Sequence, residues 1–300
     1  MSSASGRRGT RWALVAMIIG AIVMVYPYAF MIGSSLKTRK EFAEARSSLI
    51  PPRYQPAEVL AHLRGEDSAR DWPGSDWPVY QNYVDAIRYG QVDRYLANSF
   101  IYAVLITAAQ LFFNVLAAYA FARMHFAGRD LLFTLLLSTM MVPPAVLLVP
   151  NFMVVRDLGL VDTLWGILLP GFAGAFGVFL LRQAFLNIPA ELEQAARIDG
   201  CGSWGILLNV ILPLSKPALI TLGLFTFMGS WNMFEWPLVV LSKQDYYPLT
   251  VGLSFFRAET SSDWPRIFAA SAMGAAPLIA LFLLAQRYLV GGISLSGMKT

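Results

Sequence analysis

The chain has 300 residues, of which 56% are hydrophobic and only 14% are charged, with a net charge of +4 and a mean hydropathy of +0.54. Soluble domains are about a quarter charged, so this composition excludes a single soluble core and indicates a membrane protein. The single cysteine, Cys201, excludes an intrachain disulfide framework and a cysteine-built metal site. No Lys/Arg run is interleaved with aromatic residues, so nothing indicates nucleic-acid binding.

The first apolar stretch, residues 12–33, follows Arg7, Arg8 and Arg11, as the apolar core of a signal peptide follows its basic start. The stretch is longer than the usual signal-peptide core of about 7 to 15 residues, and no A-x-A cleavage pattern ends it. We therefore expect an uncleaved membrane span.

A bilayer core about 30 Å thick needs about 20 apolar helical residues to cross it. Windows of this length lie at residues 12–33, 95–122, 131–150, 163–184, 213–240 and 268–290. The sequence therefore predicts an all-α integral membrane protein, with residues 1–300 forming one membrane domain of six transmembrane helices. Six spans place both termini on the same side.

Residues 34–94, between the first two spans, carry equal numbers of basic and acidic residues. The prolines and the run DWPGSDWP predict a turn-rich external loop with little regular structure. Lys/Arg residues in short loops tend to stay cytoplasmic, and a cytoplasmic N-terminus places ten of them inside and four outside. This count predicts cytoplasmic termini, although Lys37, Arg39 and Lys40 favour the opposite orientation.

The orientation places the polar segment IPAELEQAARIDG, residues 188–200, in the cytoplasm. Pro189 suits a first helical turn, the acidic residues Glu191 and Glu193 suit the positive helix N-terminus, and a glycine ends the segment. Glu193 precedes Arg197 by four residues, which predicts an ion pair along the helix. The sequence therefore predicts a helix of about three turns.

We expect this helix to have one narrow apolar face, formed by Ile188, Leu192, Ala195 and Ala196. A helix this short needs tertiary contacts, since helices below about 12 to 15 residues are marginal in water. It could rest on the bilayer or dock against a soluble protein. Helices that rest on lipid usually have a basic face and bulky anchors, whereas this one is acidic and rich in alanine, which favours protein docking.

The same segment resembles the EAA loop of ABC-importer permeases, whose pattern is E-A-A, three residues, G, nine residues and I-x-L-P. The matching positions are Gln194, Ala195, Ala196, Gly200, Val210, Leu212 and Pro213. Gln194 replaces the family's glutamate, so the resemblance does not carry over a charged contact from that position. Val210 replaces the family's isoleucine.

Further segments resemble the MalG-type branch, which imports carbohydrates. They are NYVDAI (82–87), Asn98-Ser99, AAYAFARMHFAGR (117–129), Pro143-Pro144, LGLVDT (158–163), GSWN (229–232) and QRYLVGG (286–292). The resemblance spans nearly the whole chain. An insertion at residues 57–80 and an ending at Met298-Lys299-Thr300 depart from the pattern.

The resemblance implies a permease subunit in the bacterial cell membrane that translocates a sugar. It implies as partners a second homologous permease subunit, two ATP-binding subunits and an extracytoplasmic solute-binding protein. ATP and Mg would bind to the ATPases, and this chain would bind no cofactor. The helix that couples to the ATPase would contain Glu191, Glu193, Gln194, Ala195, Ala196, Arg197, Asp199 and Gly200.

Polar residues inside membrane spans are candidates for the substrate path. Trp231, Asn232 and Glu235 combine polar groups with aromatic rings, as a sugar site does, although this stretch also fits an aromatic belt at the outer interface. Gln110 and Asn114 lie four residues apart and either line the path or bond to a neighbouring helix. Tight helix packing explains the small residues Gly171, Gly174, Gly177, Ala270 and Gly274.

An enzymatic function has little support in the sequence. Only His62 and His125 are present, and no G-x-S-x-G or G-x-x-x-x-G-K-[ST] motif occurs, so we predict no catalytic residues, no metal site and no ATP site. Two alternatives stay open. The permease could import a non-sugar solute such as a glycerol-phosphate ester, or the chain could be a stand-alone secondary transporter, which usually shows two repeated halves.

Overall fold

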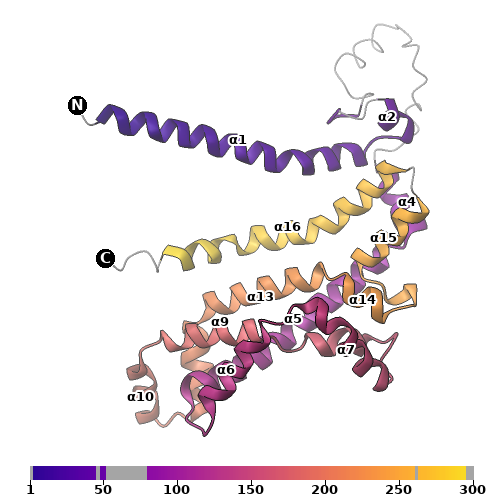
Figure 1. The fold of residues 1–300 in the computed structure, drawn as a ribbon. Helices are drawn as coiled ribbons and strands as arrows, with labels where there is room; N and C mark the ends of the chain where they lie inside the picture. The colour runs from indigo at the N-terminus through magenta and orange to yellow at the C-terminus, as the bar shows by residue number, and fades with distance from the viewer. Residues whose placement is uncertain (1–2, 45–47, 52–79, 261–262, 295–300) are drawn as a thin grey trace. The chain divides into compact units, whose positions relative to one another are not determined.

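The computed structural model describes residues 3–44, 48–51, 80–260 and 263–294. These residues are almost entirely helical and contain no strand, which confirms the predicted all-α fold (Figure 1). The chain divides into two compact units. Unit 1 contains residues 1–92 and 253–276, and unit 2 contains residues 93–252 and 277–300.

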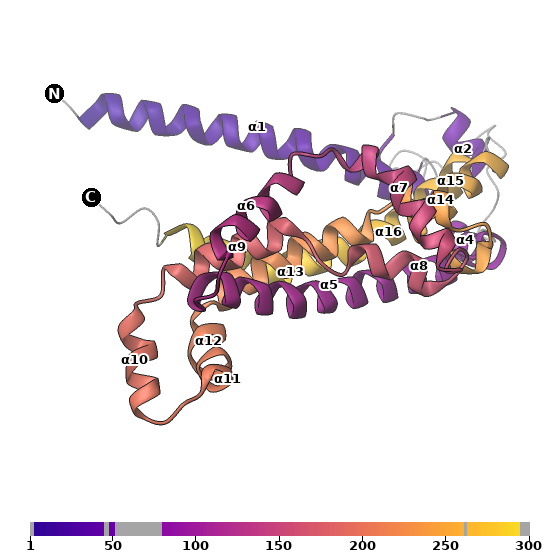
Figure 2. The same cartoon turned by 60° about the horizontal axis from the view of Figure 1, so that its bottom comes forward.

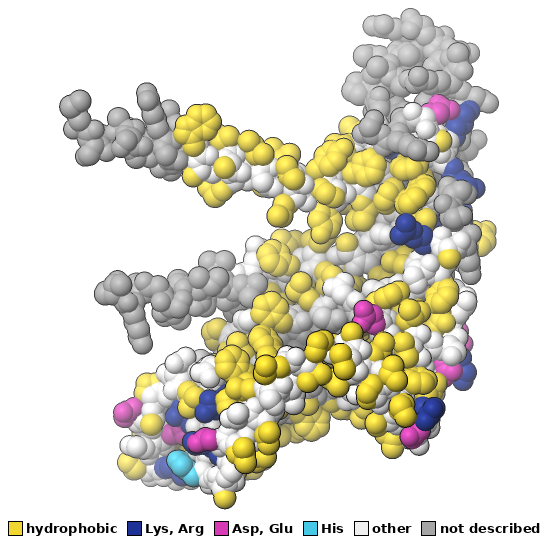
Figure 3. All heavy atoms as spheres, viewed as in Figure 1, with side chains coloured by type: hydrophobic (Ala, Val, Ile, Leu, Met, Phe, Trp, Pro, Cys, Tyr) yellow, Lys and Arg dark blue, Asp and Glu magenta, His cyan; other side chains and the backbone are white. Residues whose placement is uncertain are grey.

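Unit 1 contains α1 (Ser3–Ser35), α2 (Arg39–Glu44), α4 (Gln81–Gly90) and parts of α15 (Leu249–Glu259) and α16 (Trp264–Ser294). Residues 12–35 of α1 form an apolar span that is exposed over most of its length, and only Gly33, Ser34 and Ser35 at its end are buried. Hydrophobic side chains cover the described part of α1 in Figure 3. Because the described residues leave residues 12–29 exposed, lipid or another subunit must cover this part of the helix.

The predicted external loop, residues 34–94, is more regular than we expected. It contains α2 and α4, and α5 (Val92–Arg123) already begins at its end. The buried face of α4 is partly polar, which hid it from a hydropathy count: Asn82 donates to the carbonyls of Ser35 and Lys37 at 2.7 Å each, and Asp85 pairs with Arg266 at 3.2 Å. The insertion at residues 57–80 lies outside the described residues except for Tyr80.

Unit 2 is a helical bundle from which a loop between α9 and α13 projects (Figure 2). In chain order its bundle elements are α5, α6 (Arg129–Thr139), α7 (Pro144–Asp157), α8 (Leu164–Leu168), η2 (Leu169–Gly171) and α9 (Ala175–Leu186). The projecting loop contains α10 (Ala190–Ile198), α11 (Ser203–Ile206), the π turn η3 (Leu207–Ile211) and α12 (Leu212–Leu214). The bundle resumes with α13 (Lys216–Trp231), α14 (Glu235–Val240) and η4 (Gln244–Tyr246).

Three helices among the described residues are long and apolar enough to cross a bilayer: Trp12–Ser35, Val92–Arg123 and Trp264–Gln286. Three further helix pairs bring the total to six if each pair is one span, but they are bent by 102°, 42° and 79°. The predicted spans 131–150 and 163–184 are therefore broken rather than straight, and the third bend lies near Ser215, at the start of the predicted span 213–240. That span is also interrupted between α13 and α14.

Proline and glycine residues account for these bends. Pro143, which precedes another proline, is extended with ψ 134° and separates α6 from α7, because a residue before proline is disfavoured in a helix. Gly174 is extended with ψ 127° and separates η2 from α9. Pro217 interrupts the chain at Ser215, since a proline ring clashes with the carbonyl four residues earlier.

Candidate functional site

The polar helix predicted within residues 188–200 is present as α10, which projects beyond the ends of the long helices of unit 2 (Figure 2). Pro189 is its N-cap residue, with an extended ψ of 134°, so the helix begins one residue later than predicted. Gly200 ends the helix with φ +85°, a left-handed conformation that favours glycine. The Cys201 N–H donates to the Ala196 carbonyl at 2.9 Å across this turn, which confirms the predicted stop.

The buried face of α10 differs from the predicted one. Glu193 and Ala196 are its buried residues, whereas Leu192 and Ala195 are exposed. Only Ile188, just before the helix, and Ala196 are buried among the four residues of the predicted apolar face. The buried face contains the charged residue Glu193, so apolar residues at helical spacing do not mark it.

Glu193 reaches inward because Arg123, at the end of α5, meets it there. The Arg123 Nε lies 2.7 Å from the Glu193 Oε1, with the two side chains only 12% and 10% exposed. The predicted pair between Glu193 and Arg197 is therefore wrong. A buried carboxylate needs a buried cation, whereas the exposed side chain of Arg197 would offer only a solvent-screened contact.

Arg123 also binds the end of α9. Its Nη2 donates to the Phe185 carbonyl and, at 2.6 Å, to the Ile188 carbonyl. Carbonyls at a helix C-terminus carry partial negative charge, so the guanidinium stabilises them by hydrogen bonding and by its positive charge, although the Phe185 carbonyl also accepts from the Ile188 N–H. In the sequence, Arg123 is one of the ten basic residues assigned to the cytoplasmic side and lies within the segment 117–129, and nothing local marks it as a partner of Glu193.

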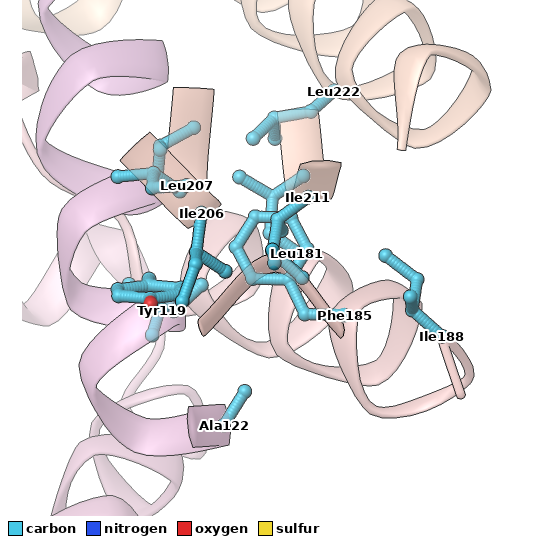
Figure 4. Close-up of a cluster of buried hydrophobic side chains, with 13 residues drawn as sticks. Tyr119, Ala122, Leu181, Phe185, Ile188, Ile206, Leu207, Ile211 and Leu222 are labelled. Carbon is cyan, nitrogen blue, oxygen red and sulfur yellow. The ribbon is translucent and has the colours of Figure 1, made fainter. Parts of the chain in front are cut away.

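An apolar cluster supports the projecting loop (Figure 4). Its fully buried members come from four elements and are all at 0% exposure: Ala118 of α5, Leu181 and Phe185 of α9, Ile206 of α11 and Ile211 of η3. Ala196 of α10 belongs to the same cluster. The loop is therefore packed against α5 and α9 rather than hanging freely.

The chain returns to the bundle through α11, η3 and α12. The Tyr119 hydroxyl on α5 donates to the Ser203 carbonyl at 3.2 Å and fixes the start of this segment. Pro213 lies two residues after the π turn, where its ring would clash with the Asn209 carbonyl in a regular α-helix. The wider π turn relieves this clash. This part of the motif, Val210, Leu212 and Pro213, thus determines the backbone path from the projecting loop back to α13 and does not form a contact surface.

The remaining α10 residues form an exposed surface. Its members are Ala190, Glu191, Leu192, Gln194, Ala195, Arg197 and Ile198 of the helix, together with the C-cap residue Asp199. Ile198 is 87% exposed, which is unusual for a large apolar side chain outside a membrane. Figure 3 shows charged side chains gathered at this end of unit 2. The surface thus mixes charges of both signs with exposed apolar groups.

Gln110 and Asn114 of α5 both bond to the neighbouring helical segment. The Gln110 Nε2 donates to the Gly171 carbonyl at 2.8 Å, and its Oε1 accepts from the Thr226 hydroxyl at 3.2 Å. The fully buried Asn114 accepts from the Gly174 N–H at 3.3 Å. Both contacts agree with the helix-packing interpretation of these amides. Their role in a substrate path stays a prediction.

The three residues around position 232 do not share one helix. Trp231 ends α13, Asn232 caps it and Glu235 begins α14. Pro237 explains the break, because its ring would clash with the Met233 carbonyl of a continuous helix, and the Thr250 hydroxyl donates to that freed carbonyl instead.

Burial divides this group as well. Trp231 is 3% exposed and stacks on Phe227, with ring centroids 5.9 Å apart. Asn232 and Glu235 are exposed. Only the two polar residues are therefore accessible to a solute in this conformation. Across the described ranges, no group of three or more His, Cys, Asp or Glu side chains could hold a metal ion.

Comparison with known proteins decides the family. Residues 110–292, more than half of the chain, match the model of the binding-protein-dependent transport system inner membrane component. The chain belongs to this family. It is an inner-membrane permease subunit of an ABC importer, and the stand-alone secondary transporter is therefore ruled out.

Relatives of this permease extend over most of its length. It is 32% identical to the "Probable ABC transporter permease protein YurM" of Bacillus subtilis, over 95% of this chain and 87% of the relative. It is 36% identical to the arabinooligosaccharides transport system permease protein AraQ of Halalkalibacterium halodurans, over 68% and 74%. It is 29% identical to the sn-glycerol-3-phosphate transport system permease protein UgpE of Brucella abortus, over 92% and 93%.

A solved structure has the same fold. The permease matches a chain of a bacterial ABC transporter involved in the import of the acidic polysaccharide alginate, with a TM-score of 0.78 and 26% identity. The match covers 96% of this permease and 99% of that chain.

Proposed function

We propose that this permease carries a di- or oligosaccharide across the bacterial inner membrane as one of two homologous membrane subunits. A solute-binding protein delivers the sugar from outside, and two ATPase subunits drive the import from the cytoplasm. Both chain termini lie in the cytoplasm. The observation that carries this proposal is α10, a short polar helix that projects from the bundle with an exposed face.

The exposed face of α10 suits a protein cleft better than a lipid surface. Helices that rest on lipid usually present a basic face, whereas this face carries Glu191 and Asp199 beside Arg197. Ile198 and Leu192 add apolar area that would be buried on docking. We therefore assign this face to the ATPase, which binds the ATP and Mg. This chain itself binds no cofactor.

Two details of the docking follow. Gln194 is exposed and uncharged, so it contributes a hydrogen bond where the family's glutamate would contribute an ion pair. Glu193 and Ala196 face into their own chain, so they support the docking surface and do not form it. Gly200 holds the end of the helix in place.

A sugar is the solute that the accessible groups fit best. Asn232 and Glu235 are exposed at the break between α13 and α14, next to the exposed ring of Phe234. Amide and carboxylate groups bond to hydroxyls, and an aromatic ring packs against the C–H face of a pyranose. Two of the relatives handle arabinooligosaccharides and alginate.

A glycerol-phosphate ester is the second candidate, because the UgpE relative covers nearly the whole chain. A phosphate requires cationic or N–H donors, and the exposed carboxylate of Glu235 would repel it. The accessible groups thus favour a sugar over a phosphate ester.

Reconstitution tests this proposal. The permease is assembled with its partner subunits in liposomes, and uptake of radiolabelled mono-, di- and oligosaccharides and of glycerol 3-phosphate is measured with and without ATP. We expect ATP-dependent uptake of an oligosaccharide that also requires the binding protein. Uptake of glycerol 3-phosphate alone would replace the sugar by the second candidate, and uptake without the ATPase would overturn the proposal.

A further inference from the structure

Arg123 contacts three separate segments of the permease at once. It ends α5, it donates to the carbonyls of Phe185 and Ile188 at the end of α9, and it pairs with Glu193 of α10. The guanidinium can do this because it presents five N–H donors in a fixed fork. A single side chain therefore ties the coupling helix to two helices of the bundle.

The contact with Glu193 is distinctive for α10. Within the described part of the chain, no other α10 side chain takes part in a hydrogen bond or an ion pair. The other inward residue, Ala196, joins the apolar cluster, which is non-directional and permits sliding. The ion pair is thus the contact that fixes the rotation and position of α10 relative to α5.

Because both partners are buried, each side chain of this ion pair depends on the other. Both side chains are about nine-tenths buried, and the guanidinium also neutralises the α9 carbonyls. Removing either partner would leave an uncompensated buried charge, which proteins tolerate poorly. While this ion pair is intact, α10 therefore moves as a rigid unit with the ends of α5 and α9.

From this arrangement we infer that Arg123 and Glu193 are positioning residues that transmit the movement of α10 to α5 and α9. The inference rests on the proposed function, because it requires α10 to receive the ATPase's movement. Neither residue touches the solute or ATP. Their role is to make force on the exposed face of α10 act on the membrane helices.

The test compares Arg123→Lys, Glu193→Gln, Arg123→Gln and the double variant Arg123→Gln/Glu193→Gln in the reconstituted complex. Asp130→Asn serves as the matched control, because Asp130 also follows α5 closely and pairs with an arginine, but its side chain is 81% exposed. Solute taken up per ATP hydrolysed is measured on assembled complex only. A purely structural role would lower the amount of complex and leave this ratio unchanged.

We expect the ratio to fall by about fivefold or more in Glu193→Gln and Arg123→Gln, the lower end of coupling between two sites. The double variant should fall no further than the worse single variant, since paired residues are non-additive. Arg123→Lys should lie between wild type and Arg123→Gln, because lysine keeps the charge without the fork.

A wild-type ratio of solute taken up per ATP in both Glu193→Gln and Arg123→Lys would overturn the inference. So would a double variant whose fold-loss in this ratio equals the product of the losses in the two single variants. If Arg123→Gln does not assemble, Arg123→Lys and Glu193→Gln decide the outcome. These results differ from a failure of the proposed function, in which the wild-type complex itself would show no ATP-dependent uptake.

Discussion

At the scale of single residues, Gly177 shows how this bundle accommodates polar groups. A Cβ atom at this position of α9 would lie 2.1 Å from the Asn114 Nδ2 and 3.2 Å from the Leu222 Cδ1. The glycine thus leaves room for the Asn114 amide, which accepts from the Gly174 N–H. The buried amide and the glycine opposite it form one packing unit.

We therefore predict that Gly177→Ala destabilises the purified permease by about 1–3 kcal/mol, the usual cost of overpacking. The Asn114 amide would have to turn away and lose its bond to Gly174. Thermal unfolding in detergent measures the effect. Gly223→Ala is the control, because its Cβ would meet Leu111 at an ordinary 3.6 Å, and equal losses in both variants would contradict the prediction.

Asp162, which lies outside the predicted spans, binds two backbone N–H groups of a distant segment through its side chain. Its Oδ1 accepts from the backbone N–H groups of Ser242 and, at 3.1 Å, Lys243. The hydrogen bond from Ser242 is the main reason that the pKa of the Asp162 carboxyl lies below its usual value. A carboxyl with a lowered folded-state pKa stabilises the fold above the unfolded-state pKa of about 3.9, and this stabilisation is lost as the pH falls through the folded-state pKa.

We expect the amides of Ser242 and Lys243 to lose protection from hydrogen exchange as the pH falls below about 4, where unfolded Asp becomes protonated. Asp162→Asn removes the titrating group and tolerates the positive φ of +58° at this position. Its exchange, corrected for the intrinsic rate, should not change over the same pH series. An identical pH response in both proteins would exclude Asp162 as the cause.

At the scale of elements, the projecting loop depends on the turn that ends α10. Gly200 has φ +85°, and a Cβ atom at this position would have no neighbouring atom within 4 Å, so backbone conformation alone requires glycine there. Gly202 also has open space but adopts φ −75°, which any residue can adopt. Because neither position is crowded, a comparison of the two glycines isolates the effect of the left-handed backbone.

Gly200→Ala should therefore cost about 1–2 kcal/mol locally, the penalty of the left-handed region. We expect insertion into the membrane at normal levels but reduced ATP-driven uptake, because the end of α10 is displaced. Gly202→Ala should behave as wild type. Normal uptake by Gly200→Ala would show that the position of this turn does not matter for coupling.

The bends between helices depend on proline positions and on packing. Pro143-Pro144 and Pro217 are visible in the sequence, but hydropathy windows still join the flanking segments into spans. A proline disfavours a straight helix, whereas the 102° bend after α6 depends on what the following segment packs against. Bend positions are therefore readable from the sequence and bend angles are not.

At the scale of the whole molecule, membrane orientation is the main prediction. Lys/Arg counts place the α5–α6 turn in the cytoplasm and the end of α7 outside. Asp130 and Asp157 mark these two positions, with side chains 81% and 65% exposed. Each is suitable for a reporter because, among the residues that the structure describes, it forms an ion pair only with the adjacent arginine.

In a Cys201→Ser background, which removes the native cysteine, we expect Asp157→Cys to react with a membrane-impermeant maleimide in intact cells. Asp130→Cys should react only after permeabilisation. Each variant is the other's control for expression and reactivity. Labelling of Asp130→Cys alone in intact cells would reverse the orientation and remove α10 from the ATPase side.

The sequence by itself determined the all-α membrane fold, the position of α10 and the stop at Gly200, because hydropathy, cap chemistry and the EAA pattern are local. Only the tertiary structure decided which way α10 faces and what holds it. Arg123 and Glu193 are 70 positions apart, and the face they create is charged, so no periodic pattern marks it. The same holds for Trp231, which is 3% exposed, because burial at the end of α13 depends on which other helices meet there.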